Sequence, residues 1–432
     1  MAGVSHATAR AAAADVALAR EVLEAPRVFY ITNLYGSAGS YFIHTLFDSH
    51  PDVWTFLYDM RRAPVFVDDF DAHTPEQHVR ALLEDNARFF DTASERGFMN
   101  TLNQLGDSRD RGIAIDRDAF ARLFTAILES VPFTMRNFAL AMTIAHNLVR
   151  GIRPRTNTFV LYTHDFPRTV LFQRGFGTGR IIGMARHPVN AHVSRGMRRF
   201  RDRLDLARAD RVDARTALRL PLYRPSEIDS LVAFYRDLPA VEERVAVLSI
   251  EELHVDPRGS MERLVADLGI RFVPSLLEST IGGLKWWGSH YTRVQGFSPG
   301  LHRDVDPRRA GVNDTAAVTL VTRCLQQHLG YTSPPLSPLG RVRAHLPGRR
   351  YLDDVGALVQ TVAGRQRSVR EQAWTVACGL ERAVKYVVGR TVLENLALRR
   401  VAALDRTADF SKLVMINPVR PGTVRWLGED GR

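Results

Sequence analysis

Lysine is scarce in this chain of 432 residues, which carries 58 lysines and arginines in total. The lysines are Lys285, Lys385 and Lys412, so arginine supplies the other 55 basic side chains. A Walker-A nucleotide site requires a lysine inside its glycine-rich loop. No lysine here follows such a loop, and the sequence therefore excludes this class of ATP or GTP site.

Cysteine is scarcer still, with Cys324 and Cys378 alone. Two cysteines cannot supply a metal cluster or a disulfide framework, and a reduced cytoplasmic protein is the simplest interpretation. No stretch reaches the ~18 uncharged apolar residues of a membrane span. The alanine-rich start carries arginine and aspartate at close spacing, which interrupts the apolar core of a signal peptide. We therefore expect a cytoplasmic protein.

The net charge of +11 is concentrated near the C-terminus. Residues 341–432 contain 17 Lys and Arg against 9 Asp and Glu, and the rest of the chain is nearly balanced. A basic tail favours an anionic surface or an acidic protein as partner, and we expect no nucleic-acid partner. Residues 195–219 hold nine arginines and four aspartates. This segment is either a solvated helix with ion pairs between its turns or a lip that attracts an anionic substrate.

Strand patterns alternate with helical patterns through most of the chain. β-branched and aromatic residues predict strands at residues 27–33, 158–163, 180–185 and 245–249. Apolar spacing predicts helices at residues 41–48, 77–92, 117–129, 136–149, 227–238 and 257–268. The alternation predicts an α/β fold with a parallel sheet flanked by helices. In such sheets ligands bind beyond the carboxyl ends of the strands.

We divide the chain into three parts. Residues 1–26 form an N-terminal helix or a disordered lead-in, and residues 27–335 form the α/β domain. Residues 336–432 form a basic, mainly helical C-terminal extension, which follows a proline-rich stretch.

The extension contains apolar residues at helical spacing, which predict an amphipathic basic helix. These residues are Val376, Leu380, Ala383, Val384, Val387, Val388, Val392 and Leu396. Two interpretations fit the pattern. The helix docks against the body or against a second subunit, which would make a homo-oligomer, or it lies on an anionic membrane surface with the protein peripheral to the membrane.

A loop of small residues follows the first predicted strand, at Gly36, Ser37, Ala38, Gly39 and Ser40. Small residues allow backbone N–H groups to turn inward, and the next helix presents its positive N-terminus. Together these features make an anion site, for which phosphate or sulfate is the usual occupant. An ordinary turn between a strand and a helix is the alternative.

Four segments, each at the end of a predicted strand, carry a resemblance to a known family. In chain order they are Gly36-Ser-Ala-Gly-Ser-Tyr-Phe42 with Asp48-Ser-His-Pro51, Tyr162-Thr-His-Asp-Phe-Pro167, Arg186-His-Pro188 with Ser194, and Leu248-Ser-Ile-Glu-Glu-Leu253 with Asp256-Pro257. The ordered set resembles the sulfotransferases that use 3′-phosphoadenosine 5′-phosphosulfate, over about residues 27–335. The resemblance implies a P-loop-NTPase-like sulfotransferase fold with a helical C-terminal appendage. It also implies a hydroxyl acceptor on a carbohydrate or glycolipid, and no metal.

The resemblance assigns roles in binding the donor. Residues 36–42, including Tyr41, match the family's 5′-phosphosulfate loop. Arg186 and Ser194 match the positions that bind the 3′-phosphate, a role suited to a guanidinium because it binds phosphate through two hydrogen bonds. Phe42 occupies the position of an aromatic that stacks on adenine, although a core helix residue is an equal reading. Arg293 lies near Gly296 in the segment that closes over the nucleotide.

His164 matches the family's catalytic histidine. Sulfuryl transfer requires the acceptor hydroxyl to lose its proton as it attacks sulfur. A neutral imidazole with a pKa near 6.5 suits that task and contributes about 10²–10⁴ in rate. The resemblance therefore implies a general base at His164.

Two departures from the family pattern remove positive charge. Ser37 stands where the family usually has lysine or arginine, and Tyr162 replaces a lysine found in many members. Charge on the leaving phosphate still needs stabilisation, so backbone amides suffice or a cation comes from elsewhere, with Lys285 and Arg293 as candidates. A non-catalytic nucleotide-binding or scaffold protein is the alternative function. An ATP-dependent small-molecule kinase is less favoured, since the sequence offers neither a loop cation nor a Mg²⁺ carboxylate.

Overall fold

The computed structural model covers the whole chain, and most of its residues are described here. The described residues are 2–57, 59–60, 70–85, 87–92, 102–177, 179–192, 226–288, 294–300, 304–305, 312–332, 335–346, 349–363, 368–389, 395–421 and 423–426. The arginine-rich segment 195–219 lies outside this set. The same holds for Ser194 and Arg293.

A six-stranded sheet forms the centre of the molecule, with strand order β2-β3-β1-β4-β5-β9 and every pair parallel. The strands are β1 (Arg27–Asn33), β2 (Val53–Thr55), β3 (Thr158–Asp165), β4 (Arg180–Ala185), β5 (Val245–Ser249) and β9 (Leu413–Asn417). Their residues are almost all buried, as expected for parallel strands covered on both faces. β1 lies between β3 and β4, with Asn33 opposite Asp165 and Met184. The carboxyl ends of these three strands therefore meet at one edge.

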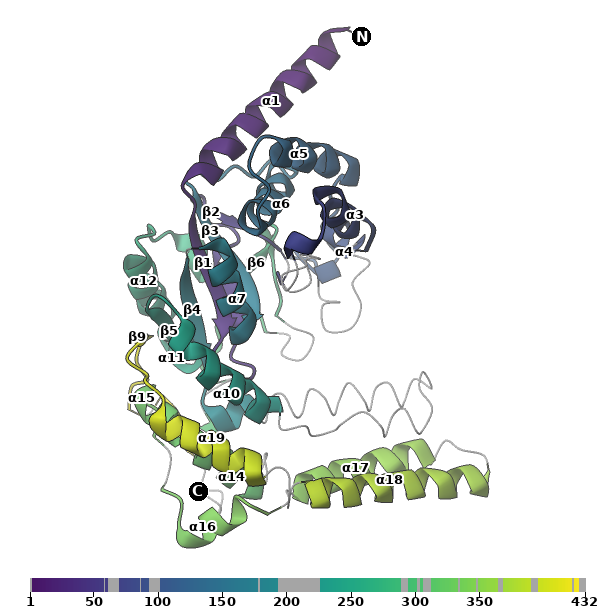
Figure 1. The fold of residues 1–432 in the computed structure, drawn as a ribbon, viewed down its shortest axis with the longest axis vertical. Coiled ribbons are helices and arrows are strands. Elements are labelled where there is room, and N and C mark those ends of the chain that lie inside the picture. The colour runs from purple at the N-terminus through teal and green to yellow at the C-terminus, as the bar shows by residue number, and fades with distance from the viewer. Residues whose placement is uncertain are drawn as a thin grey trace.

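Two groups of helices pack against this sheet (Figure 1). The first group has α7 (Phe166–Phe176) against β1, β3 and β4, with α6 (Met135–Val149) and α10 (Ser226–Asp237) beside it. The second has α2 (Ser40–Phe47) on β1 and β3, and α12 (Pro257–Leu268) on β5 and β9; the short helix η5 (Pro274–Leu277) contacts both. The short helix α11 (Ile250–Val255) directly follows β5, and η4 (Leu238–Ala240) follows α10.

Further elements surround the end of the sheet at β2. They are α1 (Ala2–Glu24), η1 (Phe70–Ala72), α3 (Pro75–Asp85), α4 (Ala87–Phe90), α5 (Arg117–Glu129) and the hairpin of β6 (Thr280–Ile281) with β7 (Leu284–Lys285). α1 is helical, the first of the two readings of residues 1–26. Its last turns pack against α5 and α6, burying Ala19, Val22 and Leu23.

The C-terminal part of the chain combines helices with strands. Its elements are α14 (Val312–Val321), α15 (Arg323–His328), α16 (Pro338–Arg343), α17 (Arg349–Ala363), α18 (Val369–Gly389), α19 (Asn395–Thr407), and β8 (Asp304–Val305) paired with β10 (Arg425–Trp426). Of the predicted helix over 376–396, the described residues belong to α18, up to Gly389, and to α19, from Asn395, while residues 390–394, including Val392, lie outside the described set.

The extension also completes the sheet, because β9 adds its edge strand beside β5. Asn417 fixes this pairing: its Oδ1 accepts from Ser249 N at 2.7 Å and its Nδ2 donates to Ser249 O at 3.1 Å. α19 packs on α10 and α14, and Asp405 accepts hydrogen bonds from the amides of Cys324 and Leu325 at the start of α15. The α/β body therefore includes a strand from beyond residue 335.

The four predicted strands are confirmed, and three of them have the expected bounds. Of the predicted helix over 77–92, residues up to Asp85 belong to α3 and Ala87–Phe90 form α4, while residue 86 lies outside the described set. The edge strands β2 and β9 were not predicted. Among the described residues, no helix has both the length and the apolar character needed to cross a membrane.

Candidate functional site

The loop after β1 is organised by the last residue of that strand. Asn33 Oδ1 accepts hydrogen bonds from Ala38 N at 3.1 Å and Ser40 N at 3.2 Å. Gly36 and Gly39 have φ angles of +58° and +86°, a region that favours glycine. The loop therefore has the curvature expected of an anion site, although two of the loop's backbone amides already donate to Asn33. The first turn of α2 contributes further N–H groups without acceptors inside the helix.

Three other strand ends contact this loop or the residue that organises it. A Cβ at Gly36 would lie 3.2 Å from Ala191 Cβ, and one at Gly39 would lie 2.6 Å from Ile250 Cδ1. Asn33 Nδ2 donates to His164 O at 3.1 Å. The structure thus brings together the ends of β1, β3, β4 and β5, which carry the four segments singled out in the sequence.

His164 has a special backbone conformation. Its φ is +65°, which is uncommon for a residue other than glycine and costs on the order of 1–3 kcal/mol. The pairing register shifts beside it: Ile31 pairs with Tyr162 and Thr32 with His164, so Thr163 has no partner in this register. Such an irregularity re-aims a side chain near the end of a strand. The His164 side chain is half-buried at the site edge, where its Nδ1 is hydrogen-bonded to Tyr162 Oη.

Arg186 begins a buried network at the end of β4. Its Nε is buried and has no hydrogen-bond partner among the described residues. Burial lowers the pKa of the guanidinium, and the nearby Glu251 carboxyl raises it in part. Glu251 is itself buried; it accepts from His187 N at 2.9 Å and from Tyr331 Oη at 2.7 Å. Burial also raises the pKa of Glu251, and the neighbouring Arg186 guanidinium opposes this by stabilising the charged carboxylate.

Ser40 carries a second buried polar group that, like Arg186 Nε, has no hydrogen-bond partner among the described residues. Its side chain is buried at the first position of α2, and its Oγ has no hydrogen-bond partner among the described residues. A buried hydroxyl and a buried guanidinium N–H without partners are costly to leave unpaired. Both groups suit a ligand with several acceptor oxygens, which is the chemistry of a phosphate or a sulfate.

Aromatic rings pack behind His164. The ring of Tyr41 lies 5.2 Å from that of Tyr162 and 5.4 Å from that of Trp286. His44 stacks on Tyr162 at 5.7 Å, and burial lowers its pKa to about 4. His44 is therefore neutral at pH 7 and packs as an aromatic residue. Tyr41 belongs to this cluster, and its hydroxyl donates to Leu57 O at 3.3 Å.

Phe42 has ring partners within the protein. His254 stacks on it at 5.0 Å with an interplanar angle of 15°, and Phe297 meets it edge-on at 5.2 Å. This packing favours the core reading of Phe42 over the adenine-stacking one. His254 Nδ1 accepts from Ser298 N at 2.8 Å, so this pair of rings also anchors the segment that precedes β8.

Lys285 does not supply the cation missing from the loop. Its Nζ lies 2.7 Å from Asp107 Oδ1 in an exposed ion pair, 5.6 Å from the ring of Trp287. Ser37 is half-buried in the loop. The other candidate cation, Arg293, and the phosphate-binding candidate Ser194 lie outside the described residues.

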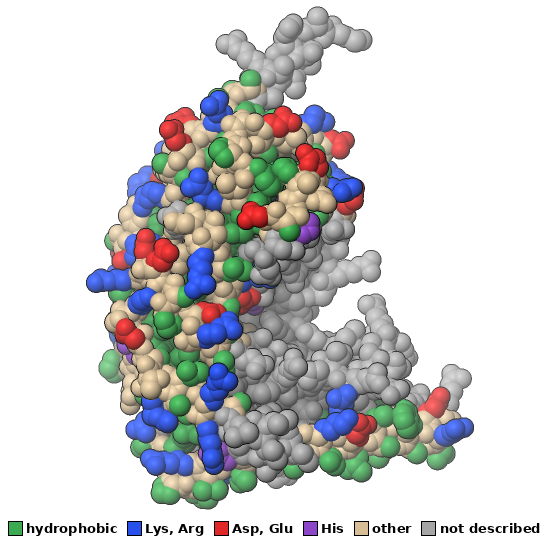
Figure 2. Space-filling model, in the orientation of Figure 1, with side chains coloured by type: hydrophobic (Ala, Val, Ile, Leu, Met, Phe, Trp, Pro, Cys, Tyr) green, Lys and Arg blue, Asp and Glu red, His purple; other side chains and the backbone are tan. Residues whose placement is uncertain are grey.

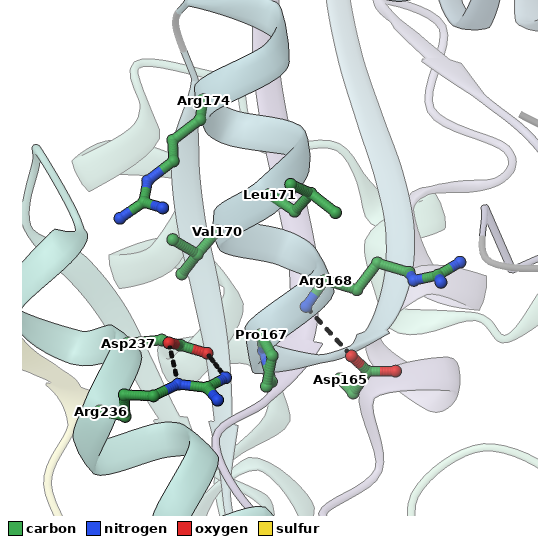
Figure 3. A pocket seen from close by; sticks show the side chains of 8 residues that line it. All are labelled: Asp165, Pro167, Arg168, Val170, Leu171, Arg174, Arg236 and Asp237. Carbon is green, nitrogen blue, oxygen red and sulfur yellow. Dashed lines mark hydrogen bonds and ion pairs between the residues drawn. The ribbon is translucent and has the colours of Figure 1, made fainter. Parts of the chain in front are cut away.

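A surface pocket of about 340 Å³ opens between α7 and α10, next to the end of β3 (Figure 3). Asp165 lines it at the start of α7 and caps that helix by accepting from Arg168 N at 3.1 Å. Arg236 and Asp237, neighbours at the end of α10, pair with each other at 2.7 Å, and Arg174 extends from α7 on the same side. Charges of both signs line this pocket, so it lacks the one-sided positive field of an anion site.

Sequence reasoning missed the residues that hold the candidates in place. The sequence pattern marks Asn33 only as the end of a strand and assigns no role to Glu251 or Tyr331, although the first two lie in or beside the recognised segments. An asparagine directly before a glycine-rich loop is a usable signal, because its side chain readily bonds nearby amides. Tyr331 is 80 residues from Glu251 in the chain, and no local pattern could have joined them.

A scan against protein-family models and a search of curated proteins return no match for this chain.

Proposed function

We propose that this chain is a sulfotransferase with a P-loop-NTPase-like fold, which transfers a sulfuryl group from 3′-phosphoadenosine 5′-phosphosulfate to a hydroxyl. The observation that carries the proposal is the meeting of four sequence-distant strand ends around the loop at residues 36–40. Arg186 and His164 lie on two of these ends, on either side of β1. The order of the strands supports the same fold, because it places the loop strand between the other two.

The donor is held by groups that match its charge. The loop and the first turn of α2 bind the 5′-phosphosulfate through backbone N–H groups and the Ser40 hydroxyl. Arg186 binds the 3′-phosphate, with its free Nε as one donor. Glu251, which Tyr331 holds by a hydrogen bond, accepts from His187 N and stabilises the charge of Arg186. In these assignments the donor supplies hydrogen-bond partners for Ser40 Oγ and Arg186 Nε.

His164 acts as the general base. In this assignment His164 Nδ1–H donates to Tyr162 Oη, and Nε2 is the atom that takes the proton of the acceptor hydroxyl. The acceptor oxygen forms a bond to sulfur while the bond from sulfur to the bridging oxygen breaks. The hydroxyl proton moves to His164 Nε2, and the electron pair of the broken bond stays on adenosine 3′,5′-bisphosphate. Tyr162, in place of a lysine, thus orients the base and adds no charge.

The acceptor in this proposal is a carbohydrate or glycolipid hydroxyl. The aromatic cluster of Tyr41, Tyr162 and Trp286 lies behind the base and supplies flat apolar faces. The buried Trp286 Nε1 has no hydrogen-bond partner among the described residues and can donate to an acceptor oxygen. A polar ligand with apolar ring faces suits these groups.

A non-catalytic nucleotide-binding protein is the second candidate. Asn33 occupies two loop amides, and Ser37 and Tyr162 remove the two cations expected near the transferred group. A site of this kind binds the bisphosphate product without stabilising the charge that develops in the transition state. Binding and transfer therefore have to be measured separately.

The binding test is calorimetry with adenosine 3′,5′-bisphosphate and with ATP. Arg186→Ala should weaken bisphosphate binding about 10- to 100-fold, since a hydrogen bond to a charged group contributes roughly 1.5–3 kcal/mol. Arg180→Ala is the matched control, because Arg180 lies at the opposite end of β4 and pairs with Asp267 at 2.8 Å. Tighter binding of ATP than of the bisphosphate, or no bisphosphate binding by the parent protein, would refute the proposal.

The transfer test follows labelled sulfate from the donor to a panel of sugars and glycolipids. His164→Ala should lower the rate by about 10²–10⁴ while leaving bisphosphate affinity within a few-fold. Transfer that persists in this variant removes the base assignment. Binding without transfer to any acceptor, by a parent protein that is folded, selects the non-catalytic alternative.

A further inference from the structure

α17 and α18 form a hairpin that reaches away from the sheet (Figure 1). The two helices approach closely, since a Cβ at Gly379 would lie 2.2 Å from Val359 Cγ2. Leu358 of α17 and Cys378 of α18 are buried in their contact. The hairpin therefore has its own small core along one side of α18.

The opposite side of α18 is apolar and exposed. Its large side chains there are Val369, Val376, Leu380, Val384 and Val387, with exposures of 81%, 54%, 65%, 53% and 38%. Hydrophobic side chains follow the lower edge of the projecting hairpin in Figure 2. A continuous apolar face of this kind marks an interaction surface, whereas single exposed apolar residues are ordinary.

The spacing along this face matches a helical partner. Its central line runs through Val369, Ala373, Val376, Leu380, Ala383 and Val387, at steps of 4, 3, 4, 3 and 4 residues. Alternating steps of three and four residues are the pattern that packs one helix against another in coiled coils and helical bundles.

The central line of this face is symmetric in size about position 378. In an antiparallel arrangement of two copies, Val369 meets Val387, Ala373 meets Ala383, and Val376 meets Leu380. Large residues thereby face large ones and small residues face small ones, so the face is complementary to itself. Self-complementarity is what a two-fold interface between identical chains requires.

The charges on α18 do not favour a lipid surface. The described side chains around the face are Arg370, Arg382 and Lys385 against Glu371 and Glu381, and Lys385 pairs with Glu381 within the helix. An amphipathic helix that lies on an anionic bilayer has a strongly basic polar face. This mixed set of charges fits a protein surface instead.

We propose that α18 is the dimerisation element of this protein. Two copies of the chain pair through the exposed face of α18 in antiparallel orientation. The two hairpins together make a four-helix bundle that lies beside the two α/β bodies. This interface is separate from the candidate catalytic site and does not depend on the proposed activity.

The first test measures the mass of the intact protein in solution by light scattering over a range of concentrations. The parent should have twice the chain mass of 48.6 kDa. Leu380→Glu should raise the dimer dissociation constant by about 100-fold or more, because it places a charge in the centre of the apolar contact. Leu339→Glu is the control: Leu339 is 58% exposed on α16, and this variant should keep the parental mass.

The second test establishes the orientation. Chains with Val369→Cys and chains with Val387→Cys are oxidised separately and then as a mixture. Antiparallel pairing gives cross-linked dimers in the mixture and none in either chain alone. The parent, whose Cys378 is buried against α17, is the control for background cross-linking. Cross-linking of either variant with itself would refute the antiparallel arrangement.

Three results would overturn dimerisation through α18. The first is a parent that stays monomeric up to high micromolar concentration. The second is a Leu380→Glu variant that dimerises as tightly as the parent. Binding of the parent to vesicles of anionic phospholipid that is lost in Leu380→Glu would assign the face to a membrane and likewise refute the proposal.

Discussion

Asn33 offers the sharpest test of how the candidate site is assembled. Its buried side chain accepts from Ala38 N and Ser40 N and donates to His164 O. It therefore holds the loop in shape and ties the loop to the end of β3. We predict that Asn33→Ala destabilises the fold and that the loop is then held less firmly in position relative to His164.

The magnitude follows from the three hydrogen bonds. Each contributes about 0.5–1.5 kcal/mol net, so their loss should lower the free energy of unfolding by about 3 kcal/mol. Asn33→Asp keeps an acceptor for Ala38 N and Ser40 N and loses the donor to His164 O. This variant should lose about 1 kcal/mol from the missing bond, and more where the carboxylate repels that carbonyl.

Urea unfolding of the three proteins gives these free energies, and calorimetry with adenosine 3′,5′-bisphosphate gives the affinity of the loop. Asn157→Ala is the matched control, since Asn157 bonds Ala25 O near the protein surface, before β3. If Asn33→Ala costs no more than Asn157→Ala, the side chain does not organise the loop and the reasoning is refuted.

Three further predictions concern the loop, the neighbouring histidine and the isolated lysine. Gly39→Ala should lower the free energy of unfolding by about 2 kcal/mol or more, because the positive φ disfavours a side chain and the new Cβ would lie 2.6 Å from Ile250 Cδ1; an unchanged urea midpoint would contradict this. Burial lowers the pKa of His254 from about 6.5 to about 4, so its contribution to stability is full above pH 6.5 and is lost as the pH falls from 6.5 to 4, by about 3 kcal/mol. His254→Asn keeps an acceptor for Ser298 N and should remove this loss in urea titrations at a series of pH values, whereas a pH profile identical to that of the parent would refute it. Lys285→Met should change bisphosphate affinity by less than two-fold in calorimetry, because its ammonium is held in an exposed ion pair, and a larger loss would place the lysine at the site.

The strands of the sheet could be predicted because their residues carry the signal locally. Segments such as Arg180–Ala185 are short runs of apolar residues bounded by glycine and proline, and burial on both faces demands that composition. The edge strands could not be predicted, because their own residues carry too little of this local signal. Leu413–Asn417 is only partly buried, and its pairing with β5 depends on a contact between segments about 170 residues apart.

The candidate site shows the same division. The loop at residues 36–40 and the side chains of His164 and Arg186 could be named from sequence, because each follows a predicted strand. The residues that hold these side chains in place could not be named from sequence, since Tyr331 bonds Glu251 from a part of the chain that is 80 residues away. The left-handed backbone of His164 also follows from the register shift between β1 and β3, which no pattern within residues 158–165 reveals.

The sequence by itself determined the alternation of strands and helices, the small-residue loop and the exclusion of a Walker-A lysine, because these are properties of local composition and spacing. Tertiary structure alone decided which strand ends meet, which amides of the loop are already bonded, and that part of the basic extension belongs to the sheet. It also decided that α18 projects with an apolar face uncovered. The physical reason is common to all four: hydrogen bonding and burial depend on neighbours in space, and those neighbours come from parts of the chain that are far apart in sequence.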